Sequence, residues 1–334
     1  FSTGTVTVGG STVLQAPGTI TLNNALVLNS AVGTSGVGSL TLAGAVSGAG
    51  GISKNGSGSL TLSAANTGYT GSTDLNAGTL IVSNNNSLGS GSLNVNAAAS
   101  LDSTGAVALA NNIGLNGNLT LLGSNALTLG GVVSGASGLV KNGSATLTLT
   151  GNNTQLGPTA LNAGTLQVGS NTALGTGALN TAAGTTLDAT AAVTLTNAVN
   201  MAADLIIGGT QALSLNGIVS GLGAGLIKNG TAALSLGGAN TYTGNTSLNA
   251  GSLIVGSNTA LGAGGTLSTA AGTTLDASTA VTLANAANIT GNLSIGGTAD
   301  LTLGGLVGGS GGLTKNGTAK LILNGANTFL SGVT

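Results

Sequence analysis

The 334-residue sequence is almost uncharged, with charged residues at 3%, a net charge of −1, and no Arg, His, Glu, Cys or Trp. This composition excludes disulfides, thiol chemistry and a Ser-His-Asp catalytic set, and it offers no basic surface for nucleic acid. Because 41% of the residues are apolar, we expect an ordered core rather than a disordered chain. The sequence contains no run of about 18 apolar residues, which a membrane-spanning helix would need.

The start of the chain looks like the interior of a longer pattern. Phe1 is not preceded by Met, and no basic region followed by an apolar stretch marks a signal peptide. Residues 1–43 resemble the back half of a unit that recurs downstream, so we expect a fragment of a longer protein.

The strongest pattern is a tandem repeat of 87 residues. Four Lys-Asn-Gly triplets recur at this interval. They are Lys54-Asn55-Gly56, Lys141-Asn142-Gly143, Lys228-Asn229-Gly230 and Lys315-Asn316-Gly317. Four asparagines keep the same register: Asn66, Asn153, Asn240 and Asn327. A fixed internal period decides the fold, and it predicts one elongated domain over 1–334. Its superrepeats are roughly 1–43 (partial), 44–130, 131–216, 217–304 and 305–334 (partial).

Inside each unit the local period is two, as in Ser59-Leu60-Thr61-Leu62, which is typical of half-buried strands. No segment has the sustained 3.6-residue period of a helix. Equivalent leucines also recur about every 20 residues. They are Leu40, Leu60, Leu80 and Leu101; Leu127, Leu147, Leu166 and Leu187; Leu213, Leu234, Leu253 and Leu275; and Leu301 and Leu321.

This spacing predicts an all-β fold, a parallel β-helix (β-solenoid) with about 20 residues per coil and four coils per superrepeat. Leu and Val would stack inward, while Thr, Ser and Asn would face water and Gly and Asn would occupy the corners. A propeller would usually show aromatic marks in blades of about 40–45 residues, and a sandwich does not explain the ladders.

The segment GLIKNGTAALSLGGANTYTGNTSLNAGSLIVGS, which starts at Gly225, resembles the autotransporter-associated β-strand repeat, also called the passenger-associated transport repeat. The first copy matches with Gly68 inserted before Tyr69, the second has Gln155 where the aromatic would stand, and the fourth keeps Phe329. The resemblance implies a secreted bacterial β-helical passenger or adhesin of type V secretion, exported through an outer-membrane barrel.

Candidate chemistry is sparse. The repeat-equivalent Asp102, Asp188 and Asp276 would lie about four coils apart, too far for the paired carboxylates of glycoside hydrolysis, so we interpret them as solvated or turn-bonding. Lys54 with Asp74, and Asp300 with Lys320, are 20 residues apart and could form surface ion pairs. The other lysines are interpreted as solubilising edge charges.

Two further motifs have alternative interpretations. The Asn-Gly-Ser/Thr sequences at Asn55, Asn142, Asn229 and Asn316 match a glycosylation signal, but Asn-Gly also favours a tight turn, which we prefer. Tyr69, Tyr242 and Phe329 could stack on sugars, but packing over a turn is the preferred interpretation.

The sequence therefore predicts a structural extracellular protein with no enzymatic activity, cofactor or metal site. It would be a stalk or fibre segment of a surface adhesin, at the cell surface or in a biofilm matrix. Its uncapped coil ends could bind another copy or adjoining chain. Two alternatives stay open: a binding module with a Thr array for ice or glycans, and a spacer that assists passenger export.

Overall fold

A computed structural model describes residues 4–334 and contains β-strands but no helix in that range. It follows that no helix of these residues could cross a membrane. The chain divides into two compact units: unit 1 is Phe1–Ala160 with Thr172–Gly177, and unit 2 is Leu161–Asn171 with Ala178–Thr334. Residues 1–3 of the first partial superrepeat lie outside the described residues.

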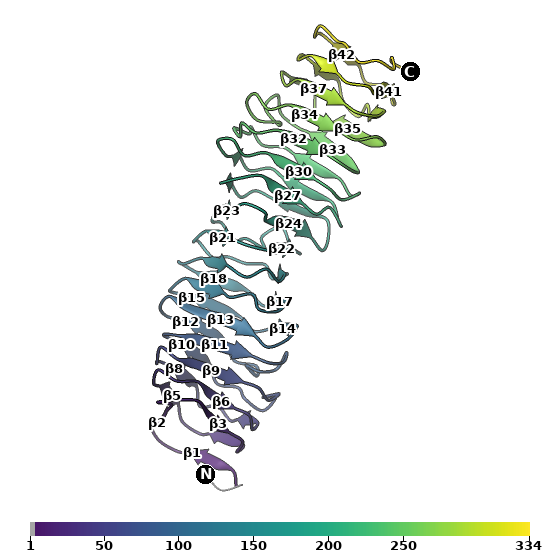
Figure 1. The fold of residues 1–334 in the computed structure, drawn as a ribbon. Helices are drawn as coiled ribbons and strands as arrows, with labels where there is room; N and C mark the ends of the chain where they lie inside the picture. Colours follow the sequence, from purple (N-terminus) through teal and green to yellow (C-terminus); the bar gives the residue numbers. More distant parts are fainter. Residues whose placement is uncertain (1–3) are drawn as a thin grey trace. The chain divides into compact units, whose positions relative to one another are not determined.

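Both units are parallel β-solenoids, as the sequence predicts (Figure 1). In unit 1, Val6 pairs with Leu26 and Leu26 pairs with Val46, so each strand lies beside its equivalent about 20 residues later. The strands are short and alternate buried and half-exposed residues, because every second side chain of an extended chain points to the same face. Each coil turns through three sides.

The sides of unit 1 are most simply described by their strands. The first side contains β2 (Thr12–Gln15), β5 (Val32–Ser35), β8 (Ile52–Lys54), β10 (Thr73–Leu75), β12 (Leu93–Val95), β15 (Ile113–Leu115) and β18 (Val133–Gly135). The second contains β3 (Ile20–Leu22), β6 (Leu40–Leu42), β9 (Ser59–Leu62), β11 (Thr79–Val82), β13 (Ala99–Ser103), β16 (Leu119–Leu121) and β19 (Leu139–Lys141). The third has β1 (Val6–Val8), β4 (Leu26–Leu28) and β7 (Val46–Ser47), then loops, then β14 (Val107–Leu109), β17 (Leu127–Leu129) and β20 (Leu147–Leu149).

Unit 2 has the same plan, and β21 (Thr159–Leu161) falls where the two units adjoin in sequence. One side contains β22 (Thr165–Val168), β24 (Thr186–Ala189), β27 (Leu205–Ile207), β30 (Leu226–Lys228), β32 (Thr246–Leu248), β34 (Leu267–Thr269), β37 (Ala287–Ile289) and β40 (Val307–Gly308). The next contains β25 (Val193–Leu195), β28 (Leu213–Leu215), β31 (Leu234–Leu236), β33 (Ser252–Val255), β35 (Thr273–Ala277), β38 (Leu293–Ile295) and β41 (Leu313–Lys315). The third has β23 (Leu179–Thr181), β26 (Val199–Met201) and β29 (Val219–Ser220), then β36 (Val281–Leu283), β39 (Leu301–Leu303) and β42 (Leu321–Leu323).

The predicted leucine ladders form the core. Leu40, Leu60, Leu80 and Leu101 are successive Cα partners along one side of unit 1. The last three of them are fully buried. Burial of each such side chain stabilises the fold by about 1.5–3 kcal/mol relative to exposure. The columns of aliphatic side chains are therefore the main stabilising feature of each unit.

The superrepeat does not hold a whole number of coils, so the prediction of four coils per superrepeat was wrong in detail. Lys54 lies on the first side of unit 1, whereas its equivalent Lys141 lies on the second. In unit 2, Lys228 and Lys315 also lie on different sides. An 87-residue repeat on a coil of about 20 residues exceeds four coils by roughly one of the three sides.

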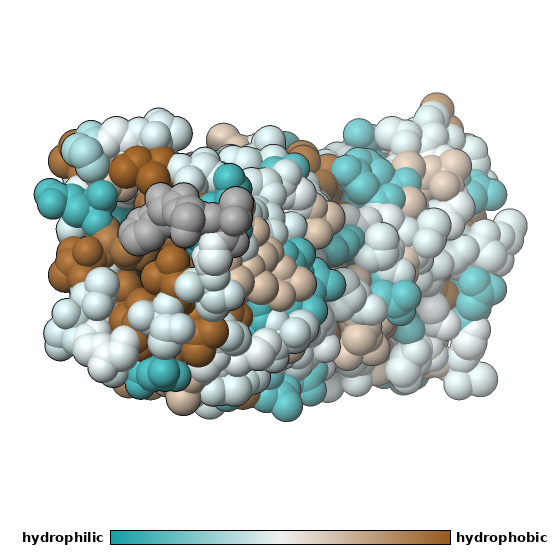
Figure 2. Space-filling view, turned by 90° about the horizontal axis from the view of Figure 1, so that it is seen from below, coloured by the Kyte–Doolittle hydropathy of each residue, from teal (hydrophilic) through white to brown (hydrophobic). Residues whose placement is uncertain are grey.

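The strands that end a sheet leave apolar side chains uncovered. Val13 on β2 is 64% exposed and Ile20 on β3 is 39% exposed. Figure 2, which views the protein from the side of the first strands, shows apolar surface there. Ile322 on β42, an end strand in unit 2, is also exposed.

Candidate functional site

The repeat motif turns its lysines into the protein. Lys54, Lys141 and Lys228 are 3%, 1% and 0% exposed. Each ends a three-residue strand whose first and third side chains point inward, so alternation places the lysine in the core. The interpretation of Lys141 and Lys228 as solubilising edge charges is therefore wrong. Lys315 is half-buried, and Lys320 is exposed.

Each buried ammonium group binds backbone oxygens at the corner of its coil. Lys54, Lys141 and Lys228 donate to the carbonyl of the glycine two residues on. Lys54 also donates to the Ala77 carbonyl at 3.0 Å, and Lys228 donates to Ala250 at 3.3 Å. These alanines belong to the recurring Leu-Asn-Ala-Gly segments one coil later, so two separate parts of the motif meet at the lysine.

Side-chain amides connect the same corners on the outside. Asn76 donates to Asn55 at 2.7 Å, and Asn249 donates to Asn229 at 2.8 Å. Asn142 and Asn316 are exposed at their own corners. The Asn-Gly pair therefore forms the bend between two sides of a coil, in agreement with the preferred turn interpretation. In the last triplet, Lys315 donates to Asn316 at 2.7 Å and Gly317 at 3.0 Å.

The glycine of the triplet is required by space. A Cβ atom on Gly56 would lie 2.5 Å from the backbone nitrogen of Gly36 and closer still to its carbonyl oxygen. Gly143 and Gly230 meet the backbone of the preceding coil in the same way. The corner can therefore close only when this residue has no side chain. Gly317 has a φ of 69°, in the left-handed region that glycine tolerates.

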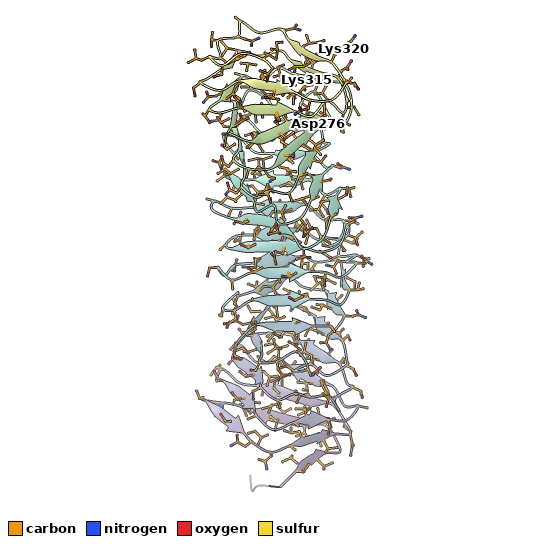
Figure 3. The ribbon with its side chains drawn as sticks, turned by 90° about the vertical axis from the view of Figure 1, so that its right-hand side faces the viewer. Asp276, Lys315 and Lys320 are labelled. Atoms are coloured by element: carbon orange, nitrogen blue, oxygen red, sulfur yellow. The ribbon has the colours of Figure 1, made fainter. Side chains whose placement is uncertain are left out.

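The proposed Lys54–Asp74 and Asp300–Lys320 ion pairs do not form. The Asp74 carboxylate accepts a hydrogen bond from Asn94 at 2.7 Å, while the Lys54 ammonium lies in the core. Asp300 accepts a hydrogen bond from the backbone N–H of Lys320 at 2.8 Å. Figure 3 shows Lys315 and Lys320 near the last strands, with Asp276 further down on β35. The Lys54–Asp74 pair is absent because the alternation of β8 points the Lys54 side chain into the core.

The constant asparagines replace a missing strand. Asn66, Asn153 and Asn240 are at most 2% exposed. Each lies in a loop that takes the place of a strand, on the third side for Asn66 and Asn240 and on the first side for Asn153. Their Oδ1 atoms accept hydrogen bonds from backbone N–H groups of the preceding coil at 2.8 Å, namely those of Val46, Val133 and Val219. Their Nδ2 atoms donate to carbonyls of the following coil at 2.6–2.7 Å, namely those of Ser87, Ala173 and Ala260.

An asparagine side chain carries the same acceptor and donor as a peptide group. Each of these amides therefore continues the backbone hydrogen-bond ladder where one side of a coil has no strand. Asn327 accepts from Val307 at 2.9 Å and is half-buried. The sequence signal for this role was a constant Asn at the point where the two-residue alternation stops.

The tyrosines fill the core beside these asparagines. Tyr69 and Tyr242 are fully buried, so they cannot stack on sugars. The Tyr69 hydroxyl accepts from the Ile52 N–H at 3.0 Å and donates to the Ser72 carbonyl at 2.5 Å, and the Tyr242 hydroxyl contacts Thr246 Oγ1 at 2.7 Å. Packing over a loop is confirmed. Phe329 is half-buried.

The repeat-equivalent aspartates bond to turns, as the sequence suggests. Asp102, Asp188 and Asp276 accept from the backbone N–H of a hydroxyl residue 22 positions later at 3.0–3.1 Å. Burial raises the pKa of Asp188, but hydrogen bonds from Thr210, Ala189 and Gln167 outweigh this effect and hold it below its usual value. The described residues 4–334 contain no group of three or more potential metal ligands.

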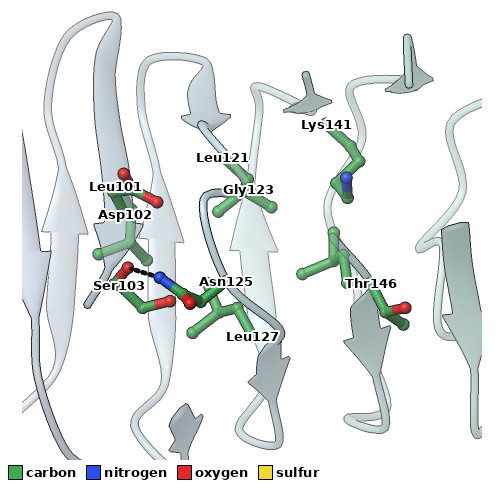
Figure 4. Close-up of a pocket in the computed structure, with 10 residues that line it drawn as sticks. Leu101, Asp102, Ser103, Leu121, Gly123, Asn125, Leu127, Lys141 and Thr146 are labelled. Atoms are coloured by element: carbon green, nitrogen blue, oxygen red, sulfur yellow. Dashed lines mark hydrogen bonds between the residues drawn. The ribbon is translucent and has the colours of Figure 1, made fainter. Parts of the chain in front are cut away.

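Two small cavities among the described residues have no room for a substrate. One of about 10 Å³ lies between Leu101, Ser103 and Lys141 (Figure 4). Another of the same volume lies beside Thr34 and Lys54. Each has room for about one water molecule. Two open surface hollows in unit 2, of about 390 and 410 Å³, share Ala202, and Asp204 lines the smaller of them.

The buried ionisable groups predict a maximum of stability at alkaline pH. Burial lowers the pKa of Lys54, Lys141 and Lys228 below 10.5, although Asp188 opposes this at Lys228. As pH rises through the lowered pKa of the folded lysines toward 10.5, the unfolded chain therefore binds more protons than the folded chain, and stability rises with pH. Burial raises the pKa of Tyr69 and Tyr242 to about 12. Above about pH 10 the unfolded tyrosines lose protons first, so stability falls.

Thermal unfolding between pH 7 and pH 12 measures this profile. We expect the rise to flatten in a Lys54→Met, Lys228→Met double variant and the fall to flatten in Tyr69→Phe, Tyr242→Phe. The exposed Lys320 provides the control, because Lys320→Met should leave the shape of the curve unchanged. A wild-type unfolding temperature that does not change over this range would contradict the burial of these groups.

A family of known proteins matches the four segments that contain the repeat motif. A family described as Passenger-associated-transport-repeat matches residues 52–82, 139–168, 226–255 and 313–334. The first match begins with β8 and ends with β11, and it therefore contains the buried lysine, the bridging asparagine and the tyrosine. No curated protein and no solved structure matches the chain significantly.

Proposed function

Because this chain is a β-solenoid built on four passenger-associated-transport repeats, we propose that it is a structural segment of a secreted bacterial protein. It would form a stalk or fibre segment of a surface adhesin or autotransporter passenger, at the cell surface or in an extracellular matrix. It would carry out no reaction. The proposal rests on both the repeats and the orientation of their polar side chains.

One observation carries the proposal: the residues that define the repeat use their polar atoms on neighbouring backbone. Lys54 binds the carbonyls of Gly56 and Ala77, and Asn66 bridges the coils before and after it. A binding or catalytic motif would present such groups to a ligand. Here they hold one coil against the next, as a structural segment requires.

An in-register deletion tests the proposal. Removal of residues 55–141 joins Lys54 to Asn142, so that a complete Lys-Asn-Gly triplet is formed at the junction. The passenger should still be secreted and should reach about 20 Å less far from its anchor, given the strand spacing. Electron microscopy of the displayed protein measures this reach. A deletion of residues 55–131 joins Lys54 to Val132, breaks the register and serves as the misfolding control. Unchanged reach would overturn the stalk assignment.

The same deletion separates the stalk from the export spacer. A spacer helps to draw the passenger out through an outer-membrane barrel, the partner that the family resemblance implies. If secretion falls when one superrepeat is removed, and falls further when a second is removed, the spacer role is favoured. If secretion is unchanged and only the reach falls, the role is architectural.

A binding role for threonine rows has less support. Thr21, Thr41 and Thr61 are successive partners in unit 1, but Ile81 and Asp102 continue the row. A flat ice- or glycan-binding face needs the same residue in nearly every coil. Thermal hysteresis of the purified protein distinguishes this alternative, and its presence would favour the binding module.

Association through coil ends extends the proposal. The exposed apolar residues of end strands, Val13, Ile20 and Ile322, can be covered by an adjoining coil of a longer chain or of another copy. Sedimentation of the purified protein distinguishes these cases: concentration-dependent fibres favour assembly of copies, and a monomer favours a stalk piece.

A further inference from the structure

The second repeat contains a polar side chain that differs from all other members of the motif. Gln155 stands where Tyr69 and Tyr242 stand in the first and third repeats, and it is fully buried. Neither its Nε2 nor its Oε1 has a hydrogen-bond partner in the protein. Thr159 is also fully buried, and its Oγ1 has no partner either.

The first and third repeats show which atoms stand at this position, beside the threonine; we call the position of the tyrosyl oxygen the slot. The Tyr242 hydroxyl contacts Thr246 Oγ1 at 2.7 Å, and the Tyr69 hydroxyl contacts Thr73 Oγ1 at 3.3 Å. Thr159 is the equivalent threonine. A glutamine side chain has three heavy atoms fewer than tyrosine, and it has no counterpart of the phenolic oxygen.

The backbone around the slot keeps the same frame in all three repeats. The carbonyl of the residue at this position accepts from an N–H one coil later: Ser90 to Tyr69 at 2.9 Å, Thr176 to Gln155 at 3.0 Å, and Ala263 to Tyr242 at 2.8 Å. The opposing glycine is also kept, as Gly175 beside Gln155 and Gly262 beside Tyr242. The backbone hydrogen bonds at this position are therefore kept where the side chain is shorter.

We propose that the second repeat binds a buried water molecule in the position of the missing tyrosyl oxygen. The water donates to or accepts from Thr159 Oγ1 and the Gln155 amide, and it lies near the Pro158 carbonyl, the equivalent of the Ser72 oxygen that Tyr69 binds. Such a site meets the requirement of two to four polar partners for an ordered internal water. Gln155 and Thr159 are fully buried, so a water held between them is shielded from bulk solvent.

A crystal structure that resolves ordered solvent tests the site directly. We expect a density peak within hydrogen-bond distance of Thr159 Oγ1 and the Gln155 amide, and no peak there in Gln155→Tyr. The tyrosine fits without an insertion, because Gln155 follows Asn153 at the same spacing as Tyr242 follows Asn240. A slot without density, or a direct Gln155–Thr159 hydrogen bond, would overturn the proposal.

Unfolding of a second variant gives an independent readout with opposite signs. In a hydrated slot, Thr159→Val removes a partner of the water and lowers the unfolding temperature by a few degrees. In a dry slot the same change removes an unpaired hydroxyl and raises it. Gln155→Tyr should raise the unfolding temperature, and the reciprocal Tyr242→Gln should lower it. A rise for Thr159→Val would refute the water site.

Discussion

The Asn240→Ala variant is expected to lose roughly 2–5 kcal/mol of unfolding free energy, because it leaves two buried backbone groups without partners. The Val219 N–H and the Ala260 carbonyl each bond to the Asn240 side chain, at 2.8 and 2.6 Å. No strand is present at this point to supply a substitute. Urea unfolding followed by circular dichroism measures the loss.

Two further substitutions make the test specific. Asn249→Ala removes an exposed amide that donates to Asn229 at 2.8 Å, and it should change the unfolding free energy by less than about 0.5 kcal/mol. Asn240→Asp keeps the size but loses the donor to Ala260, so it should be at least as unstable as Asn240→Ala. Equal effects of Asn240→Ala and Asn249→Ala would show that the buried amide does not bridge the coils.

Gly56→Ala is expected to cost about 3 kcal/mol, at the upper end of the range for overpacking. The added Cβ would strike the backbone of Gly36 in the preceding coil, and backbone cannot move aside as a flexible side chain can. The corner would have to open, which also separates the Lys54 ammonium from its carbonyl partners. The change in the urea midpoint measures the effect.

Gly105 provides the matched control in the same unit. A Cβ atom on Gly105 meets nothing within 4 Å, and its φ lies outside the left-handed region. Gly105→Ala should therefore be neutral, or should stabilise the protein by up to about 1 kcal/mol through lower entropy of the unfolded chain. If Gly56→Ala is equally well tolerated, the close approach of coils at the Lys-Asn-Gly corner is wrong.

The coil and its core could be predicted from the sequence because both depend on spacing alone. Leucines such as Leu60 and Leu80 recur at the coil length, and they are neighbours in adjacent strands. The number of sides per coil could not be predicted, since no residue marks it. The rotation of successive superrepeats therefore required the structure.

The burial of the motif lysines could be inferred from the alternation of their strands, but their charge argued against it. In Ile52-Ser53-Lys54, alternation places the lysine on the same face as the buried isoleucine, but a lysine in a core is rare unless paired. Its partners are backbone carbonyls, which a sequence does not display. The role of Asn66 was hidden for the same reason, because its hydrogen bonds join backbone groups of the coils before and after it.

Acylation of the lysines in the native protein, located by mass spectrometry, shows which of them point into the core. The lysines of the first three triplets point inward and bind backbone carbonyls. This arrangement has a direct consequence for their reactivity. It predicts rapid modification of Lys320, slower modification of Lys315, and protection of Lys54, Lys141 and Lys228 until the protein unfolds. Modification of those three at the rate of Lys320 would contradict it.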